Sequence, residues 1–301
     1  MSPPSEAFER TEGPVLAPRL VPFATHVQLH GGLFADALEA ERESMEGLRR
    51  ALFPLGTALN GRRRLLARVE RRVLSGPCPS VMVWAGALKK RLLDLGVPDG
   101  AIRVSPPGVD LALFQPEAGA PAAGRVADFL FIAHNARLKG LGPGLEALRL
   151  ARQGGLPARL AVVGRGAEGP WRRLASRLGV GDAVTFEGPL PQREVVRRLR
   201  GATALLHPTF LDPCSLACLE AAACGLPVIT TLRNGAAGRL AAAEAAIVVD
   251  DPRDVDGLAR AMEEAAEPSR RAALLDAALR LRPSLDARRH LDAVVDWLGV
   301  G

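Results

Sequence analysis

The sequence predicts an α/β fold built on parallel sheets with helices on both faces. Short apolar runs alternate with helical patterns through the second half of the chain, which is the pattern of such a sheet. The length of 301 residues, with 48% hydrophobic and 24% charged residues, suits a globular chain of about two domains. No apolar run reaches the roughly eighteen residues that a membrane span requires.

The first unit, residues 1–115, contains only about three candidate strands. Residues 1–22 show no sustained period and are expected to form a loose tail. The predicted strands are Ala24 to Leu29, Val81 to Trp84 and Ile102 to Val104, and a helix is predicted from Leu33. His30, in the turn after the first strand, is either a loop histidine or an acceptor-side contact.

A densely basic segment from Glu39 to Leu74 lies inside this unit. It has a helical pattern of leucines interleaved with arginines, namely Arg49, Arg50, Arg62, Arg63, Arg64, Arg68, Arg71 and Arg72. Such a segment is either a pair of ordinary surface helices or a surface that lies on an anionic bilayer. The net charge of +6 favours anionic partners, and the absence of tyrosine argues against nucleic acid.

Two further features bear on location and metal content. The first residues lack the order of a signal peptide, so we expect a cytoplasmic protein, and the basic segment is compatible with a peripheral position at the inner face of the cell membrane. The four cysteines include no C-x-x-C pair, so no metal site is expected.

The second unit is expected at residues 116–301, after a linker rich in Pro, Gly and Ala at 116–126. Its predicted strands are residues 128–134, 158–164, 184–188, 202–208, 227–231 and 246–250. Ligands of parallel sheets bind outside the carboxyl ends of the strands, so the loops that follow these runs form the candidate site.

The loop after the fourth of these strands reads H-P-T-F-L-D-P-C-S-L from His207 to Leu216. Asp212 and Pro213 are expected to cap a helix that runs from about Cys214 to Cys224. Asp212 and Glu220 then lie at opposite ends of one element, and the free amides of Ser215 and Leu216 face any anion there. The alternative is an ordinary cap plus a solvated glutamate.

Two other loops suggest different chemistries. Gly164, Gly166 and Gly169 match the G-x-G-x-x-G pattern after a strand, which favours an NAD-dependent oxidoreductase. Arg137 and Lys139 follow the first strand of this unit just before a helix, where both side chains can reach a diphosphate. Lys139 is one of only three lysines in the chain.

The order of these motifs is more specific than any one of them. The chain has P-P-G-V-D at 106–110, R-x-K-G after the first strand, V-V-G-x-G after the second and F-E-G-x-L after the third, followed by D-x7-E-A-x3-G-L-P-V-I-T-T. From residue 24 to about 298 this order resembles the family 4 retaining glycosyltransferases. Within that family it is most similar to the enzymes that add glucose to the lipopolysaccharide inner core.

The resemblance implies a GT-B fold, with two Rossmann-like domains facing each other across a cleft. The last helix would be able to pack back on the first domain. The resemblance also implies that Arg137 and Lys139 hold the diphosphate of a nucleotide sugar, Glu220 its ribose and Asp212 its sugar, with a glycolipid as acceptor and without a metal or other cofactor. The remaining donor-binding candidates are Cys214, Ser215, Leu216, Gly164 and Leu190.

The chain departs from the family pattern at two points. Asp212 stands where the family has glutamate, and Gly238 stands where it tends to have a further acid. Roughly a hundred family residues have no counterpart before residue 110, so an N-terminally truncated acceptor domain is expected. A non-catalytic module that binds a nucleotide sugar or a partner is therefore the alternative to an enzyme.

Overall fold

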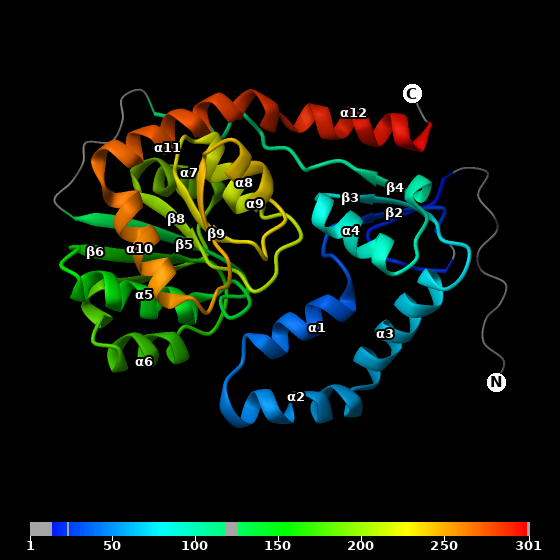
Figure 1. Cartoon of the computed structure of the whole chain (residues 1–301), viewed down its shortest axis with the longest axis horizontal. Helices are drawn as coiled ribbons and strands as arrows, with labels where there is room; N and C mark the ends of the chain where they lie inside the picture. The colour runs from blue at the N-terminus through cyan, green and yellow to red at the C-terminus, as the bar shows by residue number, and fades with distance from the viewer. Residues whose placement is uncertain (1–13, 23, 118–125, 300–301) are drawn as a thin grey trace.

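A computed structural model describes residues 14–22, 24–117 and 126–299 of the chain, and it contains two parallel sheets (Figure 1). The first sheet has the strand order β1-β2-β3-β4, and the second has the order β10-β9-β8-β5-β6-β7. All the pairings within both sheets are parallel. The predicted α/β class with two Rossmann-like units is confirmed.

The first sheet is small, and its connections are mostly helical. Its strands are β1 (Leu16–Ala17), β2 (His26–Leu29), β3 (Ser80–Val83) and β4 (Ile102–Val104). The helices are α1 (Phe34–Glu43), α2 (Gly47–Leu59), α3 (Gly61–Leu74), α4 (Gly86–Asp94) and the 3-10 turn η1 (Asp99–Ala101). The expectation of a loose tail over residues 1–22 is wrong for its last part, because β1 pairs with β2 and Leu20 is buried in the core. Residues 1–13 lie outside the described part of the chain.

The second sheet follows the predicted alternation closely. Its strands are β5 (Ala127–Ile132), β6 (Ala158–Val163), β7 (Val184–Gly188), β8 (Ala204–His207), β9 (Val228–Thr231) and β10 (Ala246–Val249). The intervening helices are α5 (Leu141–Gln153), α6 (Gly169–Arg177), α7 (Gln192–Gly201), α8 (Leu216–Ala223), α9 (Ala237–Ala242), α10 (Val255–Ala266) and α11 (Pro268–Leu281), with 3-10 turns η2 (Gly181–Ala183) and η3 (Arg282–Leu285).

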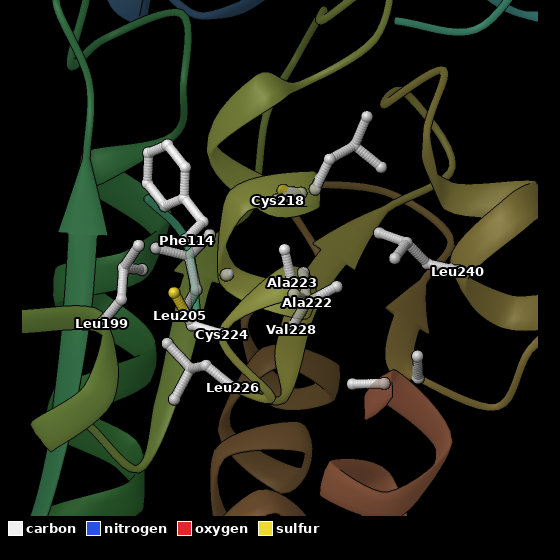
Figure 2. Packing of buried hydrophobic residues seen from close by; sticks show 14 of the residues in the cluster. Phe114, Leu199, Leu205, Cys218, Ala222, Ala223, Cys224, Leu226, Val228 and Leu240 are labelled. Carbon is white, nitrogen blue, oxygen red and sulfur yellow. The ribbon is translucent and has the colours of Figure 1, made fainter. Parts of the chain in front are cut away.

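Two apolar cores cover the two faces of this second sheet. Leu205 points into the cluster formed with α7, α8, α9 and α11, while its neighbour Leu206 points into the cluster formed with α5, α6 and α10. This alternation within one fully apolar strand is what a sheet covered on both faces requires. Figure 2 shows the first cluster, in which Phe114 from the connecting segment packs close to Leu205 and Cys224. The connection between the units is thereby anchored in the core.

The last helix, α12 (Ala287–Leu298), leaves the second unit and lies on the first sheet (Figure 1). Trp297 Nε1 donates to Ser80 Oγ at 2.7 Å, and the ring of His290 lies between Gln28 Nε2 at 2.7 Å and Ser105 Oγ at 2.8 Å. The backbone of Val109, in the segment that leads from the first unit to the second, hydrogen-bonds to Leu285 and Ala287, in the segment that leads back to the first unit. The two segments that connect the units therefore lie side by side. The boundary at 115/116 stays a prediction, and most of the expected linker, residues 118–125, lies outside the described residues.

The carboxyl ends of the two sheets face each other. A Cβ on Gly32, after β2, would lie 3.0 Å from Pro213 Cγ, and one on Gly235 would lie 2.8 Å from Ala85 Cβ, after β3. At the rim, Arg253 of the second unit donates to the Glu43 carbonyl at 2.9 Å. The candidate donor loops are thus opposed by the first unit.

No helix in the described ranges is both long and apolar enough to span a membrane.

Candidate functional site

Three side chains converge at the carboxyl end of β8: Lys139 and Asp212 come from two loops, and His207 is the last residue of the strand. Lys139 Nζ lies 2.7 Å from Asp212 Oδ2, and His207 Nε2 lies 3.1 Å from the same oxygen. Lys139 Nζ also donates to the Leu211 carbonyl at 3.0 Å. Lys139 and Asp212, predicted as separate contacts to diphosphate and sugar, are therefore direct partners in this structure.

The loop after β5 is held tightly against the end of β8. Gly140 has a φ of +82°, and a Cβ there would lie 1.9 Å from the Pro208 carbonyl oxygen, so only glycine fits. Phe210 N donates to the Leu138 carbonyl at 2.9 Å. These contacts place Lys139 beside Asp212, and α5 begins at Leu141, directly after the basic pair.

The charges of the cluster are set by burial and by mutual contact. Burial alone would raise the pKa of Asp212, but the hydrogen bond from His207 and the charge of Lys139 together lower it to about 2. Burial lowers the pKa of His207, against the opposing effect of Asp212. At neutral pH the cluster is therefore a carboxylate held by one ammonium and one neutral imidazole.

Asp212 does not cap the helix, which corrects the sequence prediction. α8 begins at Leu216 and its N-cap is Ser215, whose Oγ accepts from Cys218 N at 3.4 Å. The backbone of Asp212 instead pairs with the loop after β9, where its carbonyl accepts from Gly235 N at 2.7 Å. Pro213 and Cys214 separate Asp212 from the N-cap, and the Asp212 side chain pairs with Lys139 instead of with the helix.

The amide of Ser215 is not free for an anion, which is a second correction. It donates to Asn234 Oδ1 at 3.1 Å, and the same oxygen accepts from Ala236 N at 3.0 Å. Asn234 Nδ2 donates to Thr230 Oγ1 at 3.1 Å. Among the described residues the amide of Leu216 has no such partner, so Leu216 remains the candidate donor at this helix end.

Arg137, unlike Lys139, lines a cavity of about 370 Å³. Its guanidinium lies 5.7 Å from the centre of the Trp171 ring, a cation-π geometry. The cavity lies at the carboxyl ends of β5, β6 and β7, and its lining includes Gly164. A planar group of the size of a nucleobase fits this volume, with Arg137 among the lining residues.

The glycine pattern after β6 has a structural cause. Gly164 has a φ of +138°, and a Cβ there would lie 1.8 Å from the Ala133 carbonyl oxygen. Close approach of β5 and β6 thus demands glycine at this position without any pyrophosphate. Glu168 occupies the N-cap position of α6 and accepts from Arg172 at 2.7 Å, so a carboxylate stands at the helix end where a dinucleotide phosphate would bind. Both observations weaken the oxidoreductase interpretation.

Glu220 is not the solvated glutamate that the alternative assumed. Its side chain is half-buried in α8, and no hydrogen-bond or ion-pair partner for its carboxylate lies among the described residues. Burial raises its pKa to about 7. A carboxylate without a partner among the described residues is suited to accept hydrogen bonds from the hydroxyl groups of a ligand.

The other predicted residues lie in different settings. Cys214 is buried in the core, and burial raises the pKa of its thiol to about 12, so its side chain is inert. Leu190 is half-buried against the same core cluster. His30 is exposed and stacks on Trp84 with ring centres 4.7 Å apart, and partial burial lowers its pKa. The acceptor role of His30 stays a prediction.

Sequence reasoning missed three residues that organise the site. The sequence predicts no role for His207, although its place at the end of an apolar strand is a usable signal. Asn234 accepts from the amide of Ser215 at the start of α8, a contact that the sequence pattern does not predict. Trp171, for which the sequence predicts no role, lies against the guanidinium of Arg137. In the described part of the chain no cluster of His, Cys, Asp and Glu is arranged to hold a metal.

Several curated proteins are similar to this chain in sequence. It is 33% identical over 214 residues to a D-inositol 3-phosphate glycosyltransferase of Acidothermus cellulolyticus, covering 65% of this chain and 47% of that protein. It is 32% identical over 164 residues to the putative colanic acid biosynthesis glycosyltransferase WcaL of Escherichia coli, covering 51% and 38%. The chain spans about half the length of the curated relatives it matches, or less.

Solved structures share the fold. The crystal structure of WaaG, a glycosyltransferase involved in lipopolysaccharide biosynthesis, matches with a TM-score of 0.79 at 21% identity, covering 96% of this chain and 78% of that one. Anabaena HepE in complex with UDP-glucose matches with a TM-score of 0.70 at 14% identity, covering 92% and 72%. At these identities the matches show the two-domain GT-B fold.

The family model described as glycosyl transferases group 1 matches residues 120–279, which is more than half of the chain. This range contains Arg137, Lys139, Asp212 and Glu220. It also contains all the strands of the second sheet. The chain belongs to the group 1 glycosyltransferases.

Proposed function

We propose that this protein moves a hexose, with glucose as the expected sugar, from a nucleoside diphosphate sugar to a hydroxyl of a lipid or lipopolysaccharide-core acceptor, with retention of configuration. The observation that carries the proposal is the convergence of Lys139, Asp212 and His207 at the carboxyl ends of the second sheet. The cavity beside Arg137 supports it as a place for the base of the nucleotide.

The residues present fit the charge of such a donor. When the bond from the anomeric carbon to the diphosphate breaks, the diphosphate leaves with the electron pair, while the acceptor oxygen bonds to that carbon and releases its proton. Arg137 and Lys139 would neutralise the leaving diphosphate, aided by the Leu216 amide at the start of α8. This arrangement supplies the charge neutralisation without a metal.

The names of similar proteins support the substrate classes. HepE was solved with UDP-glucose, and WaaG is named for lipopolysaccharide biosynthesis. Other relatives are named for a D-inositol 3-phosphate substrate. A UDP-sugar is therefore the first donor to test, and the acceptor is proposed by its chemical class, a hydroxyl of a lipid or lipopolysaccharide core.

Donor turnover with two single variants tests the proposal. The ribose is common to UDP and UDP-glucose, so Glu220→Ala should weaken both ligands, whereas Asp212→Ala should spare UDP and remove the added affinity for the sugar. Calorimetry with both ligands, together with hydrolysis or transfer of radiolabelled UDP-glucose, measures this split. Nucleotide-sugar binding without any turnover would favour the non-catalytic module, and loss of UDP in Asp212→Ala alone would reverse the two roles.

Asp212→Glu tests the departure from the family pattern. If the shorter acid leaves one sugar hydroxyl poorly held, the longer side chain should raise donor turnover by up to about tenfold, the value of one hydrogen bond. Asp212→Asn is the matched control, because it keeps the length but removes the charge. An unchanged rate in Asp212→Glu would mean that the aspartate already reaches the sugar.

The membrane would be met by the arm formed by α1, α2 and α3 (Figure 1). α2 has no buried residue among those described, and Leu48, Leu52, Leu55 and Leu59 are 72%, 51%, 59% and 75% exposed. A groove of about 480 Å³ between these helices is lined by apolar side chains, five arginines, Thr57 and one acidic residue, Glu39. Exposed leucines beside arginines suit an anionic membrane surface, which supports a cytoplasmic protein attached peripherally to the inner face of the cell membrane.

Vesicle sedimentation checks this attachment. The double variant Arg49→Gln/Arg50→Gln should bind anionic vesicles less well, by about fivefold for each arginine, because each charge near the surface contributes about 1 kcal/mol. Salt should weaken the wild-type protein in the same direction. Arg193→Gln/Arg197→Gln, an equal charge change on exposed positions of α7, is the control. Binding that ignores anionic lipid and salt would return α2 and α3 to ordinary surface helices.

A further inference from the structure

His207 is a fully buried histidine whose ring has one hydrogen-bond partner, Asp212, in the cluster that these two residues form with Lys139. The residue is 2% exposed, and its Nε2 lies 3.1 Å from Asp212 Oδ2. Its other ring nitrogen, Nδ1, is buried and has no hydrogen-bond partner among the described residues. Its backbone carbonyl accepts from Thr230 Oγ1 at 2.9 Å and from Thr209 N at 2.8 Å. The ring is therefore attached to a rigid strand end and aimed at one carboxylate.

The protonation of this ring follows from its surroundings. Lys139 and Asp212 are the charged groups that face it, and the imidazole is buried, which disfavours a second positive charge beside Lys139. A neutral ring that bonds to a carboxylate must carry its proton on Nε2. His207 is thus a donor to Asp212, and Nδ1 is an unprotonated acceptor.

Lys139 and His207 both donate a hydrogen bond to the same oxygen of Asp212. Oδ2 accepts from Lys139 at 2.7 Å and from His207 at 3.1 Å. Oδ1 has no partner among the described residues, so it is the oxygen available to a sugar hydroxyl. If Lys139 contacts the diphosphate of a bound donor, its ammonium is shared with, or drawn away from, Asp212. His207 then remains as the side chain that holds the carboxylate.

We propose that His207 is a positioning residue, which fixes Asp212 through Nε2–H so that Oδ1 stays directed at the donor sugar while Lys139 serves the diphosphate. This inference rests on the proposed function, because it needs a nucleotide sugar at this site. It also assigns a reason for histidine at this position. A hydrocarbon side chain would satisfy burial but could not hold the carboxylate.

Two substitutions separate positioning from packing. His207→Gln keeps an amide donor at about the reach of Nε2, while His207→Leu keeps an apolar side chain of similar size without any donor. In His207→Leu, the affinity for UDP should stay within about twofold of wild type, whereas kcat for UDP-glucose hydrolysis should fall at least tenfold. His207→Gln should recover most of that loss. Thermal melting of both variants verifies that they are folded.

Equal losses in the glutamine and leucine variants would overturn the proposal, as would a parallel loss of UDP affinity in folded His207→Leu. A separate readout uses 15N NMR of the ring nitrogens, which is tractable because the chain has five histidines. The His207 signal should show a proton on Nε2 that persists after UDP-glucose is added and shifts in Asp212→Asn. A proton on Nδ1 instead would also overturn it.

Failure of the proposed function and failure of the positioning role of His207 give different results. If the wild-type protein binds UDP-glucose no differently from UDP and does not turn it over, the proposed function fails. The NMR signal then still reports whether His207 donates to Asp212. If turnover is present and the two His207 variants behave alike, the proposed function stands and the positioning role of His207 falls.

Discussion

Lys139→Ala is expected to weaken UDP binding at least tenfold and to slow turnover of UDP-glucose about a hundredfold. A charge-assisted contact to phosphate contributes about 1.5 to 3 kcal/mol to binding, and loss of one group that stabilises developing charge costs about 100-fold in kcat. The rate effect should exceed the affinity effect for a further reason. Lys139 is also an ion-pair partner of Asp212 at 2.7 Å, so its removal leaves His207 as the remaining side chain on that carboxylate.

Calorimetry with UDP and a hydrolysis assay with UDP-glucose measure the two effects. Arg137→Ala should weaken UDP by a similar factor, because Arg137 is the second cation proposed to contact the diphosphate and its side chain lines the cavity at the ends of β5, β6 and β7. Lys89→Ala is the matched control, since Lys89 also forms an ion pair, with Asp99 at 2.7 Å, but on α4 of the first unit. Unchanged UDP affinity in both Arg137→Ala and Lys139→Ala would rule out the site.

The sequence was sufficient for the architecture of the second unit. Its strands are apolar runs such as Phe129 to Ile132, too short for helices, and each is followed by a helical pattern of 3.6-residue period. Because this signal repeats six times, an error at one strand end does not change the fold. The strand ends then locate the site, since ligands of parallel sheets bind at that edge.

The contacts within the site could not be predicted in the same way. The prediction that Asp212 caps α8 used local chemistry alone, in which aspartate followed by proline favours a helix start. The alternative partners of Asp212 come from Lys139, 73 positions earlier, and from the strand end at His207. A charged partner outweighs a cap, and only the tertiary fold brings it near. Ser215 takes the cap instead.

The first unit was harder to predict because its sheet is small. β1 has only two residues and shows no period long enough to recognise, whereas the three residues of β4 match the predicted strand Ile102 to Val104. The core of this unit also depends on long-range packing, for example Leu20 against residues of β2 and β3. Helices α2 and α3 were visible from their spacing, but their projection from the sheet as an arm was not (Figure 1).

Glu220→Gln is expected to stabilise the fold at alkaline pH and to remove a pH dependence of the free energy of unfolding. The pKa of Glu220 rises from 4.5 to about 7 on burial, so the folded state binds a proton that the unfolded state has lost between these values. Unfolding free energy in the wild type should therefore fall by up to about 3 kcal/mol as pH rises from 4.5 to 7, and stay low above 7. Urea denaturation at several pH values measures this slope.

Glu187→Gln is the matched control, because Glu187 is also poorly exposed but has Arg198 at 2.9 Å as a cationic partner. Removing a paired carboxylate should not stabilise the protein. A wild-type unfolding free energy that is flat between pH 4.5 and 7, or an equal gain in both variants, would contradict the unpartnered state of Glu220.

Nucleotide binding should respond to the same carboxyl group with the opposite sign. The ionised form is the better acceptor for ribose hydroxyls, so UDP affinity should rise by about tenfold between pH 6 and 8 while stability falls or stays low. The phosphates of UDP titrate in the same window, but that contribution is common to the wild type and Glu220→Gln, so the difference between their pH profiles isolates Glu220. A glutamine variant that keeps the full pH dependence of UDP binding would remove Glu220 from the ribose site. One that loses it while keeping Asp212-dependent sugar discrimination would assign the two acids to the two ends of one donor.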